Sequence, residues 1–235
     1  MKKKFFLLIM LFTLMLVACQ PTASTPTKLP EPNISTNEPS PTNTAVPEPV
    51  ASPAENPALN ATLEEIEGSV EAKDIVDSDF SNASNGRTIQ QEGQVRTLED
   101  GYTRVDLSTG TLIRMAPRSY FTLVENQAED GSLFTRIKLE LGQIWVVLNG
   151  GSLEVETPSG QASVRGSYMM VEIDPETQAA LVTCLEGNCT LENPAGIVEL
   201  VNGQRARLDL PNLDDDKFDL PSIEEMSERD FAEWL

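Results

Sequence analysis

The central part of the chain alternates apolar and polar positions with a period of two over short segments. This alternation is typical of β-strands that bury one face. Glycines punctuate the segments at turn-like spacing, and no window keeps a helical period for three turns. We therefore expect an all-β fold, a single domain of about a dozen short strands over residues 61–209, built as a sandwich or as a short solenoid-like stack. The clearest predicted strands cover 103–107, 120–124, 135–141, 144–148 and 153–157.

The first residues follow a different pattern. Lys2, Lys3 and Lys4 precede an uncharged, strongly apolar stretch from Phe5 to Val17. Three positive charges followed by a short apolar run are typical of a secretory signal peptide, and the run is too short to span a bilayer comfortably. The sequence Leu16-Val17-Ala18-Cys19 resembles the lipobox of bacterial lipoproteins, which implies a signal peptide over 1–18 and a lipid on Cys19. The alternative is an ordinary signal peptide whose cysteine is incidental.

Residues 19–60 contain ten prolines, ten serines or threonines and almost no large apolar side chain. Such a segment cannot bury enough surface to offset the entropy of ordering, so we expect a disordered spacer. A recognition role for the proline-rich segment is the alternative, although it contains no PxxP repeat with flanking basic residues.

Residues 210–235 are predicted to form an acidic linker followed by a C-terminal amphipathic helix. Ser222 and Glu225 have the spacing of a capping box. The apolar residues Ile223, Met226, Phe231, Trp234 and Leu235 can then share one helix face. We expect this face to dock on the β-body, because the acidic residues of the helix disfavour an anionic membrane surface.

The amino-acid composition excludes several kinds of catalytic and metal site. The chain has no histidine, which excludes serine or cysteine nucleophiles activated by histidine, and zinc sites with histidine ligands. Its 37 acidic and 17 basic residues give a formal charge of −20, and the basic residues form no run, so nucleic acid is not an expected partner. We expect a protein that is not an enzyme and that needs no cofactor or metal.

Several short motifs, in sequence order, resemble the FecR domain family. They are Gly68-Ser69-Val70; Phe80, Ala83, Gly86 and Gly93 before Val95-Arg96-Thr97; Leu107 to Met115; Pro117-Arg118-Ser119; Leu139 to Val146; Thr157 to Val171; Glu186-Gly187; and Leu200 to Gln204. In this family the domain is the extracytoplasmic module of transmembrane sensors that control iron-uptake sigma factors, and it also occurs alone in envelope proteins.

The resemblance implies recognition of a protein or ligand and supplies no catalytic residues. Sigma-regulating members carry a cytoplasmic anti-sigma segment and a transmembrane helix before the domain. Here a lipoprotein signal and a spacer precede it, which argues against direct transfer of a signal across the membrane. Met169 also stands where the family has phenylalanine, a change that conserves core volume.

Two cysteines remain after Cys19. Cys184 and Cys189 flank Leu185 to Asn188, predicted to be a tight turn, and outside the cytoplasm they can form a disulfide across it. Free thiols are the alternative, and a redox or metal role is disfavoured because no histidine or further thiol accompanies them.

Two groups of carboxylates are candidate sites. Asp214, Asp215, Asp216 and Asp219 lack the glycine and distal glutamate of an EF-hand, so a solvated linker is favoured over a calcium site. Glu154, Glu156 and Glu172 merely share a solvent face of strands, which gives a carboxylate hydrolase little support.

Arg165, Tyr168 and Trp145 form the candidate binding patch, although core packing explains Trp145 equally well. We therefore expect an extracytoplasmic module, lipid-anchored to the cell membrane or outer membrane, that binds an envelope protein or senses a signal. A carbohydrate or cell-wall binding module is the alternative.

Overall fold

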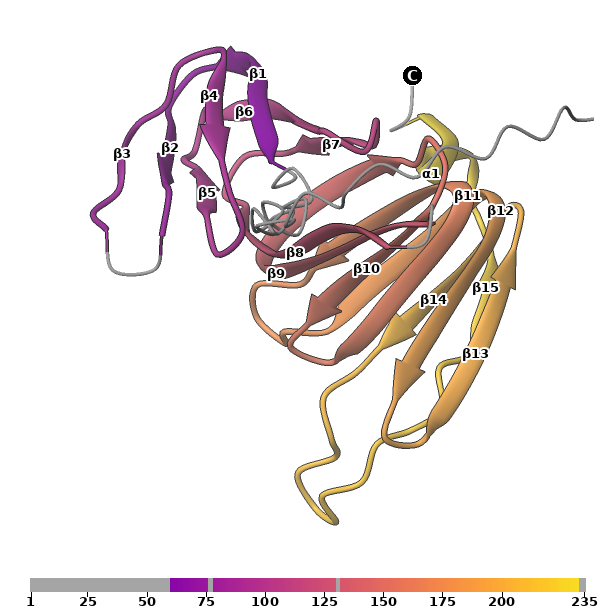
Figure 1. Ribbon diagram of the computed structural model, residues 1–235. Helices are drawn as coiled ribbons and strands as arrows, with labels where there is room; N and C mark the ends of the chain where they lie inside the picture. Colours follow the sequence, from indigo (N-terminus) through magenta and orange to yellow (C-terminus); the bar gives the residue numbers. More distant parts are fainter. Residues whose placement is uncertain (1–59, 76–77, 130–131, 233–235) are drawn as a thin grey trace, which may run out of the picture. The chain divides into compact units, whose positions relative to one another are not determined.

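The computed structural model describes residues 60–75, 78–129 and 132–232. The predicted signal peptide, Cys19 and the spacer up to residue 59 lie outside this part of the chain. The described residues form fifteen strands and one short helix, so the all-β prediction is confirmed (Figure 1). In chain order they are β1 (Ala61–Glu67), β2 (Val70–Lys73), β3 (Ser81–Asn82), β4 (Arg87–Ile89), β5 (Gln94–Thr97), β6 (Tyr102–Leu107), β7 (Leu112–Met115), β8 (Tyr120–Glu129), β9 (Ser132–Val147), β10 (Ser152–Thr157), β11 (Gly160–Ile173), β12 (Ala180–Asn193), β13 (Gly196–Val201), β14 (Gln204–Leu208), β15 (Ile223–Glu225) and α1 (Glu228–Ala232).

Hydrogen bonds join all fifteen strands into one sheet that forms two layers. The first layer has the order β3-β2-β5-β8-β9-β10-β11-β12-β13, and it uses the N-terminal halves of β9 and β11 and the C-terminal half of β12. The second layer has the order β4-β1-β6-β7-β9-β11-β12-β14-β15, and it uses the other halves of the same three strands. The protein therefore combines the sandwich with strands that run from one layer into the other.

Each of the three shared strands contains a glycine with positive φ near the crossing: Gly142 in β9, Gly166 in β11 and Gly187 in β12. At Gly142, with φ of 88°, an added Cβ would lie 2.4 Å from the Cα of Ser119. Only glycine fits such a left-handed, closely approached position without strain. The prediction of separate strands at 135–141 and 144–148 is therefore wrong, because Gly142 bends one continuous strand and does not end it.

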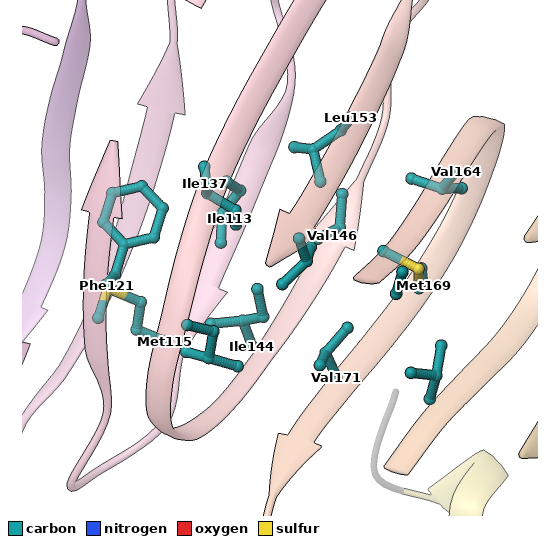
Figure 2. Packing of buried hydrophobic residues seen from close by; sticks show 14 of the residues in the cluster. Ile113, Met115, Phe121, Ile137, Ile144, Val146, Leu153, Val164, Met169 and Val171 are labelled. Atoms are coloured by element: carbon teal, nitrogen blue, oxygen red, sulfur yellow. The ribbon is translucent and has the colours of Figure 1, made fainter. Parts of the chain in front are cut away.

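One hydrophobic core fills the space between the layers (Figure 2). Phe121, Ile137, Leu153 and Val164 contribute from the first layer, and all are buried. The second layer contributes Ile113, Met115, Ile144, Val146, Met169 and Val171. Met169 has no exposed surface and fills its core position.

The C-terminal segment differs from its prediction. Ser222 does not cap a helix, because Ile223–Glu225 form strand β15 and pair with β14. The helix begins later, at Glu228, and Ser227 caps it, because the Ser227 hydroxyl accepts from the backbone N–H of Asp230 at 3.4 Å. In return, the Asp230 carboxylate accepts from the backbone N–H of Ser227 at 2.6 Å and from its hydroxyl at 2.8 Å. The predicted common face is also wrong, since Ile223 lies in a strand; Trp234 and Leu235 lie outside the described residues.

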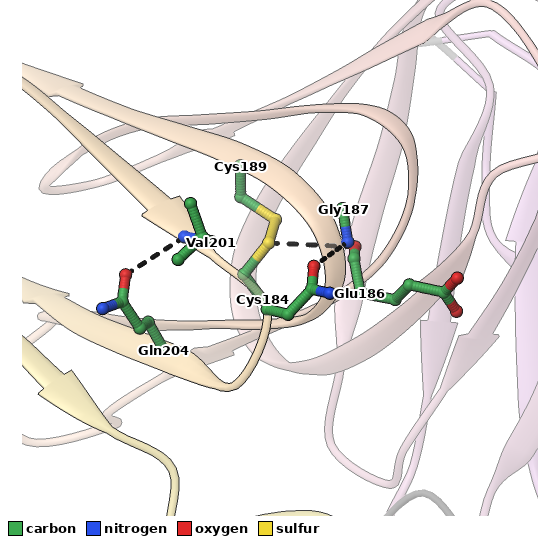
Figure 3. The surroundings of a disulfide bond; sticks show 7 residues. Cys184, Glu186, Gly187, Cys189, Val201 and Gln204 are labelled. Carbon is green, nitrogen blue, oxygen red and sulfur yellow. Dashed lines mark hydrogen bonds between the residues drawn. A yellow bond between two sulfur atoms is a disulfide. The ribbon is translucent and has the colours of Figure 1, made fainter. Parts of the chain in front are cut away.

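Cys184 and Cys189 lie in β12 with their Cα atoms 5.9 Å apart, and a disulfide joins them (Figure 3). The predicted hairpin turn between them is wrong, because β12 continues through both positions and passes there from the second layer to the first. Both cysteines are fully buried. The backbone N–H of Gly187, between them, donates to the Asn202 side chain at 2.6 Å. The disulfide therefore spans the crossing of this strand.

Candidate functional site

A row of side chains crosses the outer face of the second layer. Arg114 on β7 pairs with Trp145 on β9, Trp145 with Met170 on β11, and Met170 with Thr183 on β12. Their sequence neighbours belong to the core, so alternation along each strand points the row away from it. Thr183 is followed by Arg205 on β14. Side chains from five strands thus form a continuous row, which we call the outer row.

The C-terminal helix closes one end of the outer row. The Arg205 guanidinium donates to the two carboxylate oxygens of Asp230 at 3.1 and 3.0 Å, and to Glu224 at 3.2 Å. This contact fixes α1 beside the row. Met170 and Thr183 are buried even though they face outward. The Gln143 side chain donates to the Met170 sulfur at 3.0 Å.

The other end of the outer row opens into a hollow of about 310 Å³. Trp145, Arg114 and Met115 line it from β9 and β7, Tyr102 and Arg104 from β6, and Glu65 and Glu67 from β1. Tyr102 is about half exposed at 48%. Aromatic surface together with a few convergent polar groups is the usual make-up of a binding site. We call this hollow the groove.

One wall of the groove is held by an ion-pair network. Arg104 donates to both carboxylate oxygens of Asp106, at 2.6 and 2.8 Å, and also pairs with Glu65. The hydrogen bond to Asp106, followed by the charges of Asp106 and Glu65, raises the pKa of Arg104 above its ordinary value against the opposing effect of burial. The charge of Arg104 is therefore neutralised within the protein.

Two groups in the groove are left without partners. The Trp145 indole N–H is buried and donates to no acceptor in the described part of the chain. Arg114 is exposed and forms no ion pair or hydrogen bond with any described residue. A buried donor without an acceptor costs stability, and such groups are rare in native proteins. Their coincidence in one hollow makes the groove the candidate functional site.

The structure divides the binding patch predicted from the sequence. Trp145 lies in the groove, and Tyr168 shares its face of the second layer, opposite Val147 on β9. Arg165 lies on the part of β11 that belongs to the first layer, in a separate hollow lined by Leu133, Gly151 and Ser152. The arginine that accompanies Trp145 is therefore Arg114, because β11 changes layers between Arg165 and Tyr168.

Sequence reasoning missed Arg114 and Tyr102. The alternation of Leu112-Ile113-Arg114-Met115 does place Arg114 on a solvent face. What the sequence lacks is the register that pairs β7 with β9, about thirty residues later. No local pattern encodes which strand lies beside which, so the aromatic and basic residues of the groove could not be combined.

The remaining candidates form no site in the structure. Within the described ranges, no three Asp, Glu or Cys residues come together closely enough to hold a metal ion. Glu154 and Glu156 bind Arg136 at 3.0 and 3.5 Å, and Glu172 lies on β11 in the other layer. In the acidic loop, Asp215 pairs with Lys217 at 2.8 Å. Among the residues that the structure describes, none forms a helix of the length and apolarity that a membrane crossing requires.

The fold and the groove define an all-β domain whose candidate site is suited to binding. Residues 93–190 match the family model described as FecR protein, and this part of the chain is a FecR domain. The match covers the motifs from Val95 to Gly187 that suggested the family. The motifs around Gly68 to Gly86 and around Gly203 lie outside it.

Comparison with solved structures gives two alignments to a "putative anti-sigma factor" from Parabacteroides distasonis ATCC 8503, in crystal structures at 2.50 and 1.65 Å resolution. The identities are 15% and 14% and the TM-scores 0.47 and 0.48. Each alignment covers 60% of this chain and 63% of the other, so the match spans less than two thirds of those proteins. No curated protein of similar sequence was found.

Proposed function

We propose that this protein is a non-enzymatic binding module of the signalling kind, held outside the cytoplasm by a lipid on Cys19, and that its groove binds an envelope protein. The observation that carries the proposal is a FecR domain with an open hollow lined by Arg114 and Trp145, where neither the Arg114 guanidinium nor the Trp145 N–H has a partner among the described residues. Groups left unsatisfied in the free protein become favourable contacts once a partner supplies their acceptors.

The sequence supports the same class of function. Without histidine, the chain cannot build the common nucleophilic triads. Glu154 and Glu156 pair with Arg136, and Glu172 lies in the other layer, so these carboxylates form no hydrolytic pair. The FecR resemblance implies an extracytoplasmic regulatory module, and the lipoprotein signal with its spacer fits a domain tethered at some distance from the membrane.

Photo-crosslinking in living cells tests the proposal. A photoreactive phenylalanine analogue replaces Tyr102, which lines the groove and is half exposed. The control places the same analogue at Leu213, which is fully exposed in the loop before β15. We expect the analogue at position 102 to form an adduct with one envelope protein, and this adduct to disappear when Trp145 is replaced by alanine. The analogue at position 213 should not form the adduct. Identical adducts at both positions, or none at Tyr102, would contradict the proposal.

A carbohydrate or cell-wall ligand is the second candidate, because Tyr102 and Trp145 bring two aromatic side chains to the groove. Sugar rings commonly pack on such surfaces. If this candidate is correct, the full chain should sediment with purified peptidoglycan, and Tyr102→Ala should release it. A protein that remains in the supernatant removes this candidate.

A further inference from the structure

We infer that the groove recognises an extended peptide segment that carries a carboxylate side chain, with Arg114 binding the carboxylate. The inference rests on the proposed function, since it specifies the chemistry of the partner. It starts from three observations at one place: the hollow, the arginine without an acid and the indole N–H without an acceptor.

The first argument concerns charge. Residues 61–208 include 23 acidic and 11 basic residues. Because acidic residues are in excess, each arginine is expected to form an ion pair with an aspartate or glutamate. Every other lysine or arginine whose side chain is described has an ion pair or another interaction. Arg114 has neither. It is the side chain in the described part of the protein that is ready to receive an external carboxylate.

The second argument concerns the neighbours of Arg114. Arg104, directly opposite on β6, is neutralised by Asp106 and Glu65 and does not compete for a ligand. Glu67 lies at the β1 side of the groove and repels a carboxylate placed there. A bound segment is therefore oriented with its carboxylate toward β7. Guanidinium groups bind carboxylates through charge-assisted hydrogen bonds, which are stronger than neutral ones.

The third argument favours a peptide over a sugar. Trp145 is partly buried and its N–H is out of contact with solvent, so the indole does not present a wide open platform. A small side-chain shift, common at interfaces, allows the N–H to donate to a peptide carbonyl. Arg114 and Trp145 occupy paired positions on adjacent strands, where Cα atoms lie about 5 Å apart, so one short stretch of an extended peptide can reach both side chains.

Peptide titration tests the inference. The full chain is purified in detergent with Trp234→Phe, which leaves Trp145 as its one tryptophan because the sequence has two. Two acetylated and amidated pentapeptides, Ala-Leu-Asp-Leu-Ala and Ala-Leu-Asn-Leu-Ala, are titrated while Trp145 fluorescence is recorded. We expect the aspartate peptide to bind about tenfold more tightly, even though the body as a whole repels anions.

Two variants complete the experiment. Arg114→Gln should abolish the difference between the peptides. Arg118→Gln should preserve it, because Arg118 is exposed, pairs with Glu99 and lies outside the groove. Circular dichroism verifies that each variant is folded.

Equal affinities for the two peptides, or no saturable binding of either, would overturn the inference. So would a change of Trp145 fluorescence on adding the sugar chitotetraose when neither peptide produces one. The crosslink at Tyr102 separates this failure from failure of the proposed function. If Arg114→Gln keeps the cellular adduct, the partner binds in the groove without the carboxylate contact. If the adduct is absent while the aspartate peptide binds, the groove does recognise a carboxylate, but the proposal that its partner is an envelope protein is contradicted.

Discussion

At the residue scale, the glycines within the long strands carry much of the information about the fold. Gly142 and Gly166 both have positive φ, but their surroundings differ. A Cβ at Gly142 would overlap the backbone of Ser119, whereas a Cβ at Gly166 would meet nothing within 4 Å. Comparing substitutions at Gly142 and Gly166 therefore distinguishes the cost of backbone strain from the cost of steric overlap.

Gly142→Ala and Gly166→Ala are expected to differ in stability. Gly166→Ala pays only for the left-handed backbone, about 1 kcal/mol. Gly142→Ala adds the collision with Ser119 and should cost about 3 kcal/mol or more. Denaturant unfolding of the purified full chain measures both. Equal losses in the two variants would show that the strand crossing tolerates a side chain at Gly142.

Asp230 joins the C-terminal segment to the sheet. Burial alone would raise its pKa, but hydrogen bonds from Ser227 and the charge of Arg205 outweigh burial and hold the pKa below its ordinary value. A carboxylate with a lowered pKa in the folded state stabilises the protein above its unfolded pKa, and this contribution is lost as the pH falls through the folded value.

We therefore expect Asp230→Asn to lower the free energy of unfolding by about 1 to 3 kcal/mol at pH 7, because a buried, charged hydrogen-bond acceptor is replaced by a neutral amide. The loss should shrink as the pH falls below the ordinary aspartate pKa and through the lower pKa of the folded state, where the wild-type carboxylate becomes protonated. Thermal unfolding of both proteins across this pH range provides the measurement. Asp215→Asn, at an exposed pair with Lys217, is the control and should change little. A difference between wild type and Asp230→Asn that does not depend on pH would contradict the assignment.

At the element scale, the sequence predicted strands well and their continuity poorly. The period-two segments 103–107, 120–124 and 153–157 all lie within observed strands, because burial of one face imposes the alternation. A glycine with positive φ looks the same in sequence whether it ends a strand or bends it. The merging of 135–141 with 144–148, and the continuity of β12 through Cys184 and Cys189, depend on pairing between distant strands and could not be predicted.

The same limit explains the candidate site. Trp145 was predicted from its residue type, and it does line the groove. Arg165 was predicted beside Tyr168 because they are close in sequence, but the strand changes layers between them. Sites assembled from the outer faces of several strands require the register, which a single sequence does not contain.

The disulfide in β12 makes an element-scale prediction. Replacing both cysteines with alanine should cost about 2 kcal/mol, because the linkage closes only a short loop of the unfolded chain. Denaturant unfolding with and without reductant measures the effect. Wild type should lose a similar amount on reduction, while Cys184→Ala/Cys189→Ala should not respond. A wild-type protein that is insensitive to a reductant shown to release two thiols would contradict this account.

At the scale of the whole molecule, negative charge is concentrated toward the C-terminus. Residues 209–235 hold ten acidic and two basic residues, a much higher density than in the body. Arg205 binds Glu224 and Asp230, and Lys217 binds Asp215, so basic residues hold part of this segment in place. The excess charge opposes close approach of this segment to an anionic membrane.

The proposed anchor predicts a clear difference between two chains in the cell. Wild type should incorporate a clickable fatty acid and sediment with membranes, whereas Cys19→Ser should do neither, because the serine hydroxyl is not the acceptor of the lipid. Gel fluorescence after labelling provides the measurement. An unlabelled wild-type protein recovered free in the medium would contradict the proposal.

The strands shared by the two layers have a mechanical consequence. Trp145, in the groove, and Arg136, which binds Glu125 and Glu154 on the first layer, belong to the same strand β9. The two layers therefore cannot separate by a hinge motion, because β9, β11 and β12 run through both layers and would have to lose their pairing at the bends. A force applied to the groove is therefore carried along the backbone of β9 into the opposite layer, and the domain should unfold under force as one unit.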